Sequence, residues 1–167
     1  MHKVSIVSRG RAAGYTLKLP SEDRHLYTRS HFLEELASAL GGFAAEQIMF
    51  GEITTGPHDD LKKATDLARS LVTRFGRSDK VGPLTLDGQD ETIFLGRELS
   101  TGRNYSEETA RIVDSEVKRL MDEALATAKK ILTERRETLD AIAAVLIEKE
   151  TIEREAFEKI VGGETDA

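Results

Sequence analysis

The segment TTGPHDDLKKATDLARSLVTRF, residues 54–75, decides the fold of this chain because it carries its clearest helical pattern. Gly56 and Pro57 suit the opening of a helix, and Gly76 suits its end. Apolar residues recur at steps of three and four, the spacing of one helix face: Leu61, Ala64, Leu67, Ala68, Leu71, Val72 and Phe75. At about 100° per residue, Asp60 falls on the inward edge of that face. An ionised carboxylate at a buried edge needs a partner, so Asp60 is the first candidate for a functional residue.

Two interpretations of Asp60 follow from the residues alone. In the structural one, its partner is the helix N-terminus, whose free N–H groups and positive dipole end favour acids, or a basic side chain such as Arg74. In the functional one, Asp60 is half of a metal site. Asp59 and Asp66 point to water on the same helical wheel and are not candidates.

Composition indicates a soluble domain rich in helices. The chain has 167 residues, of which 39% are hydrophobic, enough for a core, and only 5% are aromatic. The formal net charge of −6 and the lack of a basic stripe argue against nucleic-acid binding. Cysteine is absent, which excludes disulfides and thiolate catalysis. The longest apolar run, residues 141–147, is too short to cross a bilayer, so a membrane anchor is expected only outside this chain.

The first half of the chain predicts a hairpin followed by helices. Residues 3–7 and 14–19 read as two extended segments around a turn-rich break. Thr28 or Ser30 then caps a helix that runs to about Phe50, in which the Gly41-Gly42 pair indicates close packing or a kink. Residues 77–105 read as a loop region with short strands near 84–86 and 92–95.

The second half predicts long helices. Ser106 caps an amphipathic helix whose apolar seam, from Ala110 to Ile131, requires a packing partner. A second apolar face follows within residues 139–146, and Thr151 is expected to start a last short helix that ends at the pair Gly162-Gly163.

Several kinds of catalytic site lack sequence support. The four histidines, His2, His25, His31 and His58, include no pair at the spacing that places two imidazoles on one helix face. His58 and Asp60 splay apart on a helix, so His58 is interpreted as an exposed first-turn residue. No phosphate-binding glycine loop follows Gly41-Gly42. From its residues alone, this is a helical domain with one unexplained aspartate.

Six motifs, in this order, resemble the peptidase domain of the FtsH family of membrane-bound ATP-dependent zinc metalloproteases. They are HKVSIVSRGRAAGYTLKLPSEDR, ALGGFAAEQIMFGE, TTGPHDDLKKATDLAR, RFGRSDKVGPL, IFLGREL and YSEETARIVDSEVKRLM. The resemblance spans about residues 2–161 and implies a mainly α fold, a helical FtsH-type peptidase domain with a small N-terminal β-hairpin and a C-terminal long-helix bundle. Residues 1–105 are expected to form the C-terminal portion of the zinc peptidase core, and residues 106–167 the bundle.

The resemblance also implies roles for particular residues. The family's third zinc ligand is the aspartate of a TTGxxNDL-like motif, which falls on Asp60 and favours the functional interpretation. Glu46 matches an acid near the zinc histidines and is either the orienter of a ligand imidazole or an ordinary helix-margin charge. The strand Gly14, Tyr15, Thr16 and Leu17 resembles the family's edge strand, where an extended substrate pairs by its backbone. Asp59 stands where asparagine is usual, and Gln47 where a second glutamate is common.

The implied activity belongs to a larger protein. In the family an HExxH helix lies just upstream of the segment matching His2, so this chain is expected to lack two histidine ligands, the glutamate base and the ATPase, and to be inactive alone. The parent would be a homohexamer in an inner or plasma membrane, with its peptidase domain in the cytoplasm, or in the matrix or stroma of an organelle. It would use zinc, with ATP and Mg²⁺ in the ATPase, to degrade membrane and unfolded cytosolic proteins. The alternative is a non-catalytic helical assembly module, either a truncated paralogue or a pseudoprotease.

Overall fold

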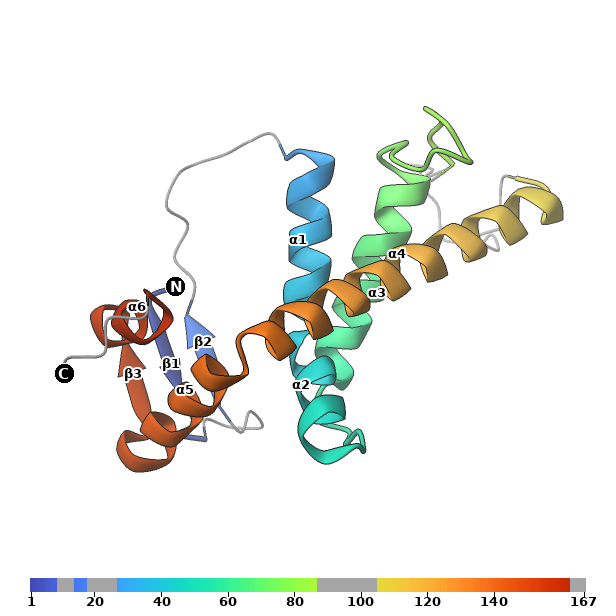
Figure 1. Cartoon of the computed structure of the whole chain (residues 1–167). Helices are drawn as coiled ribbons and strands as arrows, with labels where there is room; N and C mark the ends of the chain where they lie inside the picture. The colour runs from blue at the N-terminus through green and yellow to red at the C-terminus, as the bar shows by residue number, and fades with distance from the viewer. Residues whose placement is uncertain (9–13, 18–26, 87–104, 163–167) are drawn as a thin grey trace, which may run out of the picture. The chain divides into compact units, whose positions relative to one another are not determined.

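The fold is mainly helical, as the sequence predicts (Figure 1). The structure, drawn in Figure 1, is a computed structural model that describes residues 1–8, 14–17, 27–86 and 105–162. Its elements are β1 (Lys3–Ser5), β2 (Tyr15–Leu17), α1 (Arg29–Ala39), α2 (Gly41–Phe50), α3 (His58–Thr73), α4 (Glu107–Glu134), α5 (Arg136–Lys149), β3 (Thr151–Glu153) and α6 (Arg154–Gly162). They form two compact units, Met1–Leu26 with Ile131–Ala167, and Tyr27–Lys130. The expected boundary at residue 105 stays a prediction.

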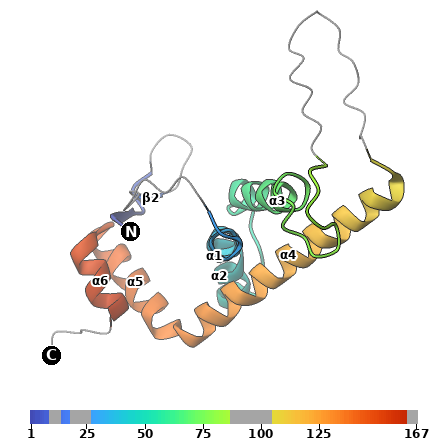
Figure 2. The ribbon, with the colours of Figure 1, turned by 90° about the horizontal axis from the view of Figure 1, so that it is seen from above.

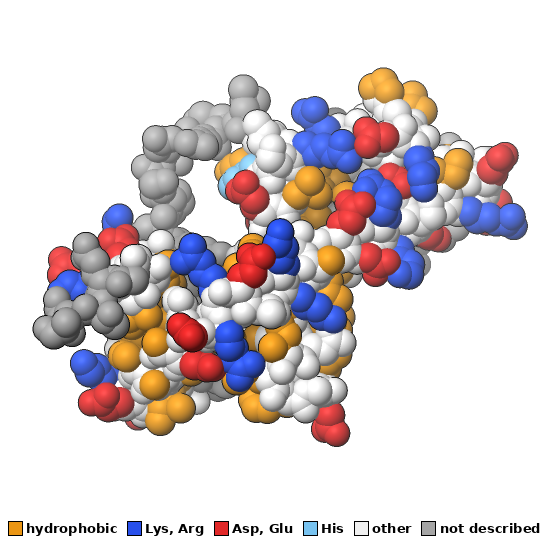
Figure 3. Space-filling model, in the orientation of Figure 1, with side chains coloured by type: hydrophobic (Ala, Val, Ile, Leu, Met, Phe, Trp, Pro, Cys, Tyr) orange, Lys and Arg blue, Asp and Glu red, His pale blue; other side chains and the backbone are white. Residues whose placement is uncertain are grey.

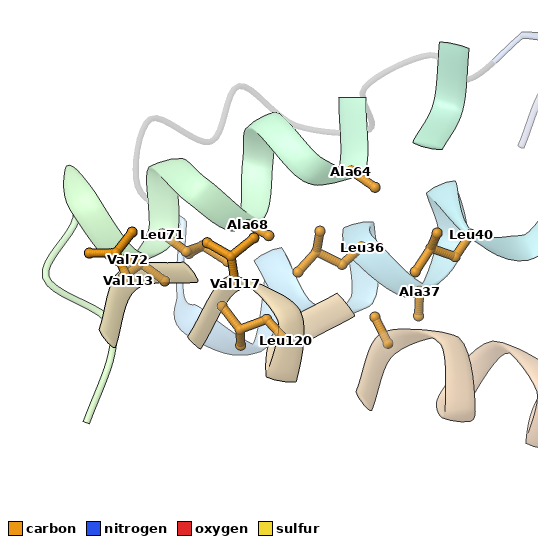
Figure 4. Close-up of a cluster of buried hydrophobic side chains, with 11 residues drawn as sticks. Leu36, Ala37, Leu40, Ala64, Ala68, Leu71, Val72, Val113, Val117 and Leu120 are labelled. Carbon is orange, nitrogen blue, oxygen red and sulfur yellow. The ribbon is translucent and has the colours of Figure 1, made fainter. Parts of the chain in front are cut away.

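The unit Tyr27–Lys130 is built on the apolar faces of α1, α3 and α4 (Figure 4). Both views of the ribbon show α1 and α3 beside α4 (Figures 1 and 2). The buried cluster consists of Leu36, Ala37, Leu40, Ala64, Ala68, Leu71, Val72, Val113, Val117, Leu120 and Ala124. Ala64 and Ala68 are fully buried, and their small side chains allow neighbouring helices to approach closely. The expected partner for the apolar seam of α4 is therefore α1 with α3.

The predicted helix over residues 28–50 is two helices. Thr28 caps α1, since its Oγ1 accepts a hydrogen bond from the His31 amide at 3.3 Å. The chain bends at Leu40, between α1 and α2. A Cβ built on Gly41 or Gly42 meets nothing within 4 Å, so the glycines mark a kink and not a close helix contact.

A buried carboxylate connects α4 to the loop that follows α3. The side chain of Glu116 is 1% exposed and accepts hydrogen bonds from Ser78 Oγ at 2.9 Å and from Arg119 Nη2 at 3.0 Å. Lys80 Nζ lies 3.1 Å from its other oxygen. The hydrogen bond from Arg119, aided by Lys80 and Ser78, outweighs burial and lowers the pKa of Glu116 from its ordinary 4.5 to about 2. Glu116 is thus charged and fully paired at neutral pH.

The start of α4 agrees with the sequence pattern, whereas the preceding loop does not. Ser106 Oγ accepts a hydrogen bond from the Thr109 amide at 3.2 Å, which is the expected cap. Acidic and basic side chains alternate over the exposed side of α4 (Figure 3). Residues 84–86 are not a strand; the Leu86 amide donates to the Thr73 carbonyl at 2.7 Å and Thr85 Oγ1 to the Arg74 carbonyl at 3.4 Å, which hold this segment against the end of α3. The strand expected at 92–95 lies outside the described residues.

The other unit contains a three-stranded antiparallel sheet in the order β2-β1-β3. The pairing of β1 with β2 confirms the predicted hairpin. The third strand was not predicted: Thr151 starts β3, and the last helix begins only at Arg154. Ile152, 1% exposed, fills the core side of β3, and the register pairs it with Val4. Alternation over only three residues is too short to identify such a strand from sequence.

The turn between α5 and β3 places a non-glycine residue in the left-handed region. Glu150 has φ 60° and ψ −15°, and its carbonyl accepts hydrogen bonds from the Ile6 amide at 3.0 Å and from Ser5 Oγ at 3.2 Å. This cap therefore sets where β1 meets β3. Within the described part of the chain, no helix has the length and apolarity needed to span a membrane.

We expect Glu116→Gln to lower the free energy of unfolding at pH 7 by about 2–3 kcal/mol, since it removes the charge that Arg119 and Lys80 pair with. The native pKa lies below the unfolded value, so the stabilisation is complete above pH 4.5 and fades as the pH falls toward 2. Urea unfolding at several pH values measures this. Glu123→Gln, which removes an exposed partner of the same Arg119, is the control and should cost less than about 1 kcal/mol. Equal losses for the two variants would contradict the prediction.

We expect Glu150→Gly to raise the free energy of unfolding by about 0.5–1 kcal/mol, because glycine adopts a positive φ without steric cost. Glu148→Gly, the same change inside α5, should lower it by about 1 kcal/mol. Thermal unfolding of both variants checks the pair, and destabilisation by Glu150→Gly would show that the Glu150 side chain contributes more than its backbone costs.

Candidate functional site

The first turn of α3 carries the candidate metal ligand. Pro57 precedes the helix, and Asp59 and Asp60 lie in its first turn, where carboxylates complement the helix dipole. Residues 58–63 are all exposed, and burial on α3 begins at Ala64. The helix therefore extends one and a half turns beyond its packed region, and this projecting end presents Asp60.

The structure corrects the expected burial of Asp60. Its side chain is 58% exposed and forms an ion pair with Lys63, Oδ1 to Nζ, at 3.2 Å. The partner is a basic side chain, as the structural interpretation expects, but it is Lys63 and not Arg74. The helical wheel gave the correct direction relative to Ala64 and Leu71, but no described element covers the first turn, so that side of α3 meets solvent. His58 is exposed, as expected.

Glu46 lies on α2, before the turn that leads into α3. Its Oε2 accepts a hydrogen bond from the Thr54 amide at 2.7 Å, and its Oε1 accepts one from Thr54 Oγ1 at 3.0 Å. Thr54 Oγ1 in turn accepts from the Gly56 amide at 3.0 Å. Glu46 is thus more than an ordinary helix-margin charge, because both of its oxygens hold the segment before the Asp60 helix.

The residues expected to bind an extended substrate lie at the edge of the sheet. Tyr15, Thr16 and Leu17 form β2, which pairs with β1 alone among the described strands. Gly14 precedes it in close contact with β1, since a Cβ there would lie 2.6 Å from the Ser5 carbonyl oxygen. Any other residue at position 14 would push the two strands apart.

The donor set of the described residues does not complete a zinc site. No group of three histidine, cysteine or acidic side chains lies close enough together within residues 1–8, 14–17, 27–86 and 105–162 to hold a metal ion. The buried polar atom without a hydrogen-bond partner in this part of the chain is Gln47 Oε1, an amide oxygen, whereas zinc prefers sulfur, imidazole nitrogen and carboxylate oxygen. Asp60 fits one ligand position, and the remainder of a site is not present in the described structure.

Sequence reasoning missed two polar residues that organise these regions. Thr54 stands at the start of a motif with nothing in the sequence to mark it, and it makes both contacts with Glu46. Glu116 was one of many acids on a long helix, and its burial depends on the distant Ser78 and Lys80. The available signal for Glu116 was its place between Val113, Val117 and Leu120, on the apolar seam.

Comparison with known proteins identifies the family. The family model described as "Peptidase family M41" matches residues 1–160. An "ATP-dependent zinc metalloprotease FtsH 1" of Conexibacter woesei is 48% identical over 99% of this chain and 25% of its own length. The "ATP-dependent zinc metalloprotease FtsH" of Kosmotoga olearia is 50% identical over 97% of this chain and 25% of its own length. The protein of the same name from Thermotoga maritima is 42% identical over 98% of this chain and 27% of its own length.

These matches have two consequences. The chain spans about a quarter of the length of the curated relatives, so their names describe proteins much larger than the part compared. The family match covers residues 1–160, which include Glu46 and Asp60. The chain belongs to peptidase family M41 and is a relative of the FtsH proteases, as its motifs indicate.

Proposed function

We propose that this chain is part of an ATP-dependent zinc metalloendopeptidase and that Asp60 supplies one protein ligand to its zinc ion. The observation that carries the proposal is the projecting first turn of α3. There Asp60 occupies the motif of the family ligand and keeps an accessible carboxylate, paired only with the neighbouring Lys63 among the contacts found for it. A surface ion pair of this kind costs little to exchange for another cation.

The whole protein supplies what these residues lack. Two histidine ligands and a glutamate base would come from an HExxH helix, and ATP hydrolysis from a separate domain with ATP and Mg²⁺. A zinc ion with three protein ligands and one open position acidifies a bound water and polarises a carbonyl group. The parts proposed for this chain are narrower: Asp60 contributes one oxygen donor, and Glu46 keeps lone pairs with which to orient a ligand imidazole.

Substrate binding is proposed for β2. β2 lies at the edge of the described sheet, and an extended polypeptide can add to such an edge through main-chain hydrogen bonds. This mode suits a protease that accepts many sequences, since backbone pairing does not depend on side chains. The proposed substrates are membrane proteins and unfolded proteins, processed by a membrane-anchored homohexamer.

We expect this chain by itself to retain less than about 0.1 zinc ion per molecule after dialysis and to show no peptidase activity, because one carboxylate does not replace a three-ligand site. Inductively coupled plasma mass spectrometry measures the zinc content. Stoichiometric zinc that survives dialysis would contradict the incomplete site. The same zinc measurement on the whole protein separates an enzyme, which binds zinc, from the alternative of an assembly module, which does not.

In the whole protein, we expect Asp60→Ala to abolish proteolysis and to leave ATP hydrolysis within about twofold of wild type, since the two sites are built in separate domains. Glu46→Gln should show a milder loss of proteolysis, about 10–100-fold, as changes next to ligands do. Asp66→Ala removes another exposed carboxylate of α3 and is the matched control, which should degrade casein at the wild-type rate. Casein degradation and phosphate release are measured on one preparation, and near-normal proteolysis by Asp60→Ala would show that the ligand lies elsewhere.

A further inference from the structure

We propose that Thr54 is a positioning residue: with Glu46 it forms a clamp that fixes the start of α3 and so the place of the Asp60 carboxylate. The role assigned to Asp60 rests on the proposed function, whereas the clamp itself does not. It is distinct from any contact between Glu46 and a metal-ligating imidazole, because it acts on the protein backbone of residues 54–58.

The clamp joins two segments through a pair of hydrogen bonds to one carboxylate. The two oxygens of Glu46, on α2, accept from the amide and the hydroxyl of Thr54 at 2.7 and 3.0 Å. Hydrogen bonds to an ionised carboxylate are stronger than those between neutral groups, and two of them fix direction as well as distance. The loop of residues 51–57 is thereby tied to the helix before it.

The turn closes tightly around this pair. The Gly56 amide donates to Thr54 Oγ1 at 3.0 Å, so the hydroxyl donates to Glu46 and accepts from Gly56 at once. A Cβ on Gly56 would lie 3.2 Å from Thr54 Oγ1 and 3.4 Å from Glu46 Oε1. A side chain at position 56 would therefore crowd the Thr54 hydroxyl, and glycine avoids this.

Backbone hydrogen bonds carry the constraint into the helix. The His58 amide donates to the Thr55 carbonyl at 3.2 Å, and the Leu61 amide donates to the Pro57 carbonyl at 2.9 Å. Asp60 lies between the two donor residues, within the turn that the second bond closes. Its ion pair with Lys63 is within the same helix and does not fix the helix against anything else. Residues 58–63 are exposed, so two features bound the first turn of α3: the clamp on its N-terminal side and the packing that begins at Ala64 on its C-terminal side.

Amide hydrogen exchange of this chain, measured by NMR, tests the clamp without any metal. Thr54→Val keeps the shape of the side chain and removes the hydroxyl, and Thr54→Ser keeps the hydroxyl. Thr65→Val is the matched control, since Thr65 Oγ1 donates to the Leu61 carbonyl on the same helix but takes no part in the clamp. Glu46→Gln removes the charge from the other side.

We expect Thr54→Val to raise the exchange rate of the Gly56 amide about fivefold to tenfold, and those of the His58 and Leu61 amides at least about threefold. Glu46→Gln should raise the same exchange rates, and combining it with Thr54→Val should raise them little further. Thr54→Ser and Thr65→Val should leave the exchange rates of the His58 and Gly56 amides near wild type. Unchanged exchange at His58 and Leu61 in Thr54→Val would overturn the proposal, because the packed part of α3 would then suffice to hold its first turn.

Peptide hydrolysis by the whole protein separates positioning from general damage. Thr54→Val should lower kcat at least about fivefold with KM and ATP hydrolysis unchanged, and Thr54→Ser should restore it. A normal kcat in Thr54→Val, alongside an inactive Asp60→Ala, would overturn the positioning role and leave the proposed function standing. An active Asp60→Ala would overturn the proposed function, while hydrogen exchange would still decide whether the clamp exists.

Discussion

The close packing of α3 against α1 and α4 is the constraint on which the larger unit depends. Ala64 and Ala68 have no exposed surface, and Leu71 and Val72 continue the same stripe toward α4. Small residues at the contact let the helix axes approach, and larger ones on the neighbouring helices fill the remaining space. Because this packing begins at Ala64, it divides α3 into a held part and a projecting first turn. The candidate ligand is on the projecting part, where another protein segment can reach it.

Two polar contacts hold the loops on either side of α3, where the apolar packing ends. Glu116 ties the loop after α3 to α4, and Glu46 ties the loop before α3 to α2. The two carboxylates differ in environment. Glu116 is buried and has a depressed pKa, so its removal takes a charged acceptor from Arg119 and Lys80, whereas Glu46 is only half-buried and accepts from backbone and hydroxyl donors. We therefore expect the first to govern the stability of the unit and the second to govern local geometry.

The positions of the main helices and the family were predictable from the sequence, whereas the burial of particular side chains by distant elements was not. The periodicity of residues 54–75 and the caps at Thr28 and Ser106 depend on local chemistry, and the structure agrees with them. The break at Leu40 was indicated by glycines but not located. The strand at Thr151 depends on pairing with β1, about 150 residues away in sequence, and no local pattern reveals it. The prediction that Asp60 is buried was wrong for a related reason. A helical wheel gives the direction of a side chain, but the side chain is buried only if a neighbouring element packs on that side.

The exposure of Asp60 bears on how a shared metal site is assembled. A carboxylate that is already buried with one partner must lose that partner before it binds a metal, and the cost is high in a low-dielectric interior. Asp60 avoids this cost because its carboxylate is exposed beside the exposed Lys63 side chain, while the helix sets its direction. In the proposed site, this part of the protein would present one oxygen donor in a fixed direction, and the metal would join it to donors from another segment. The direction of the Asp60 carboxylate would then decide whether it reaches the metal. For this reason we expect the hydroxyl of Thr54, six residues before Asp60, to influence metal binding.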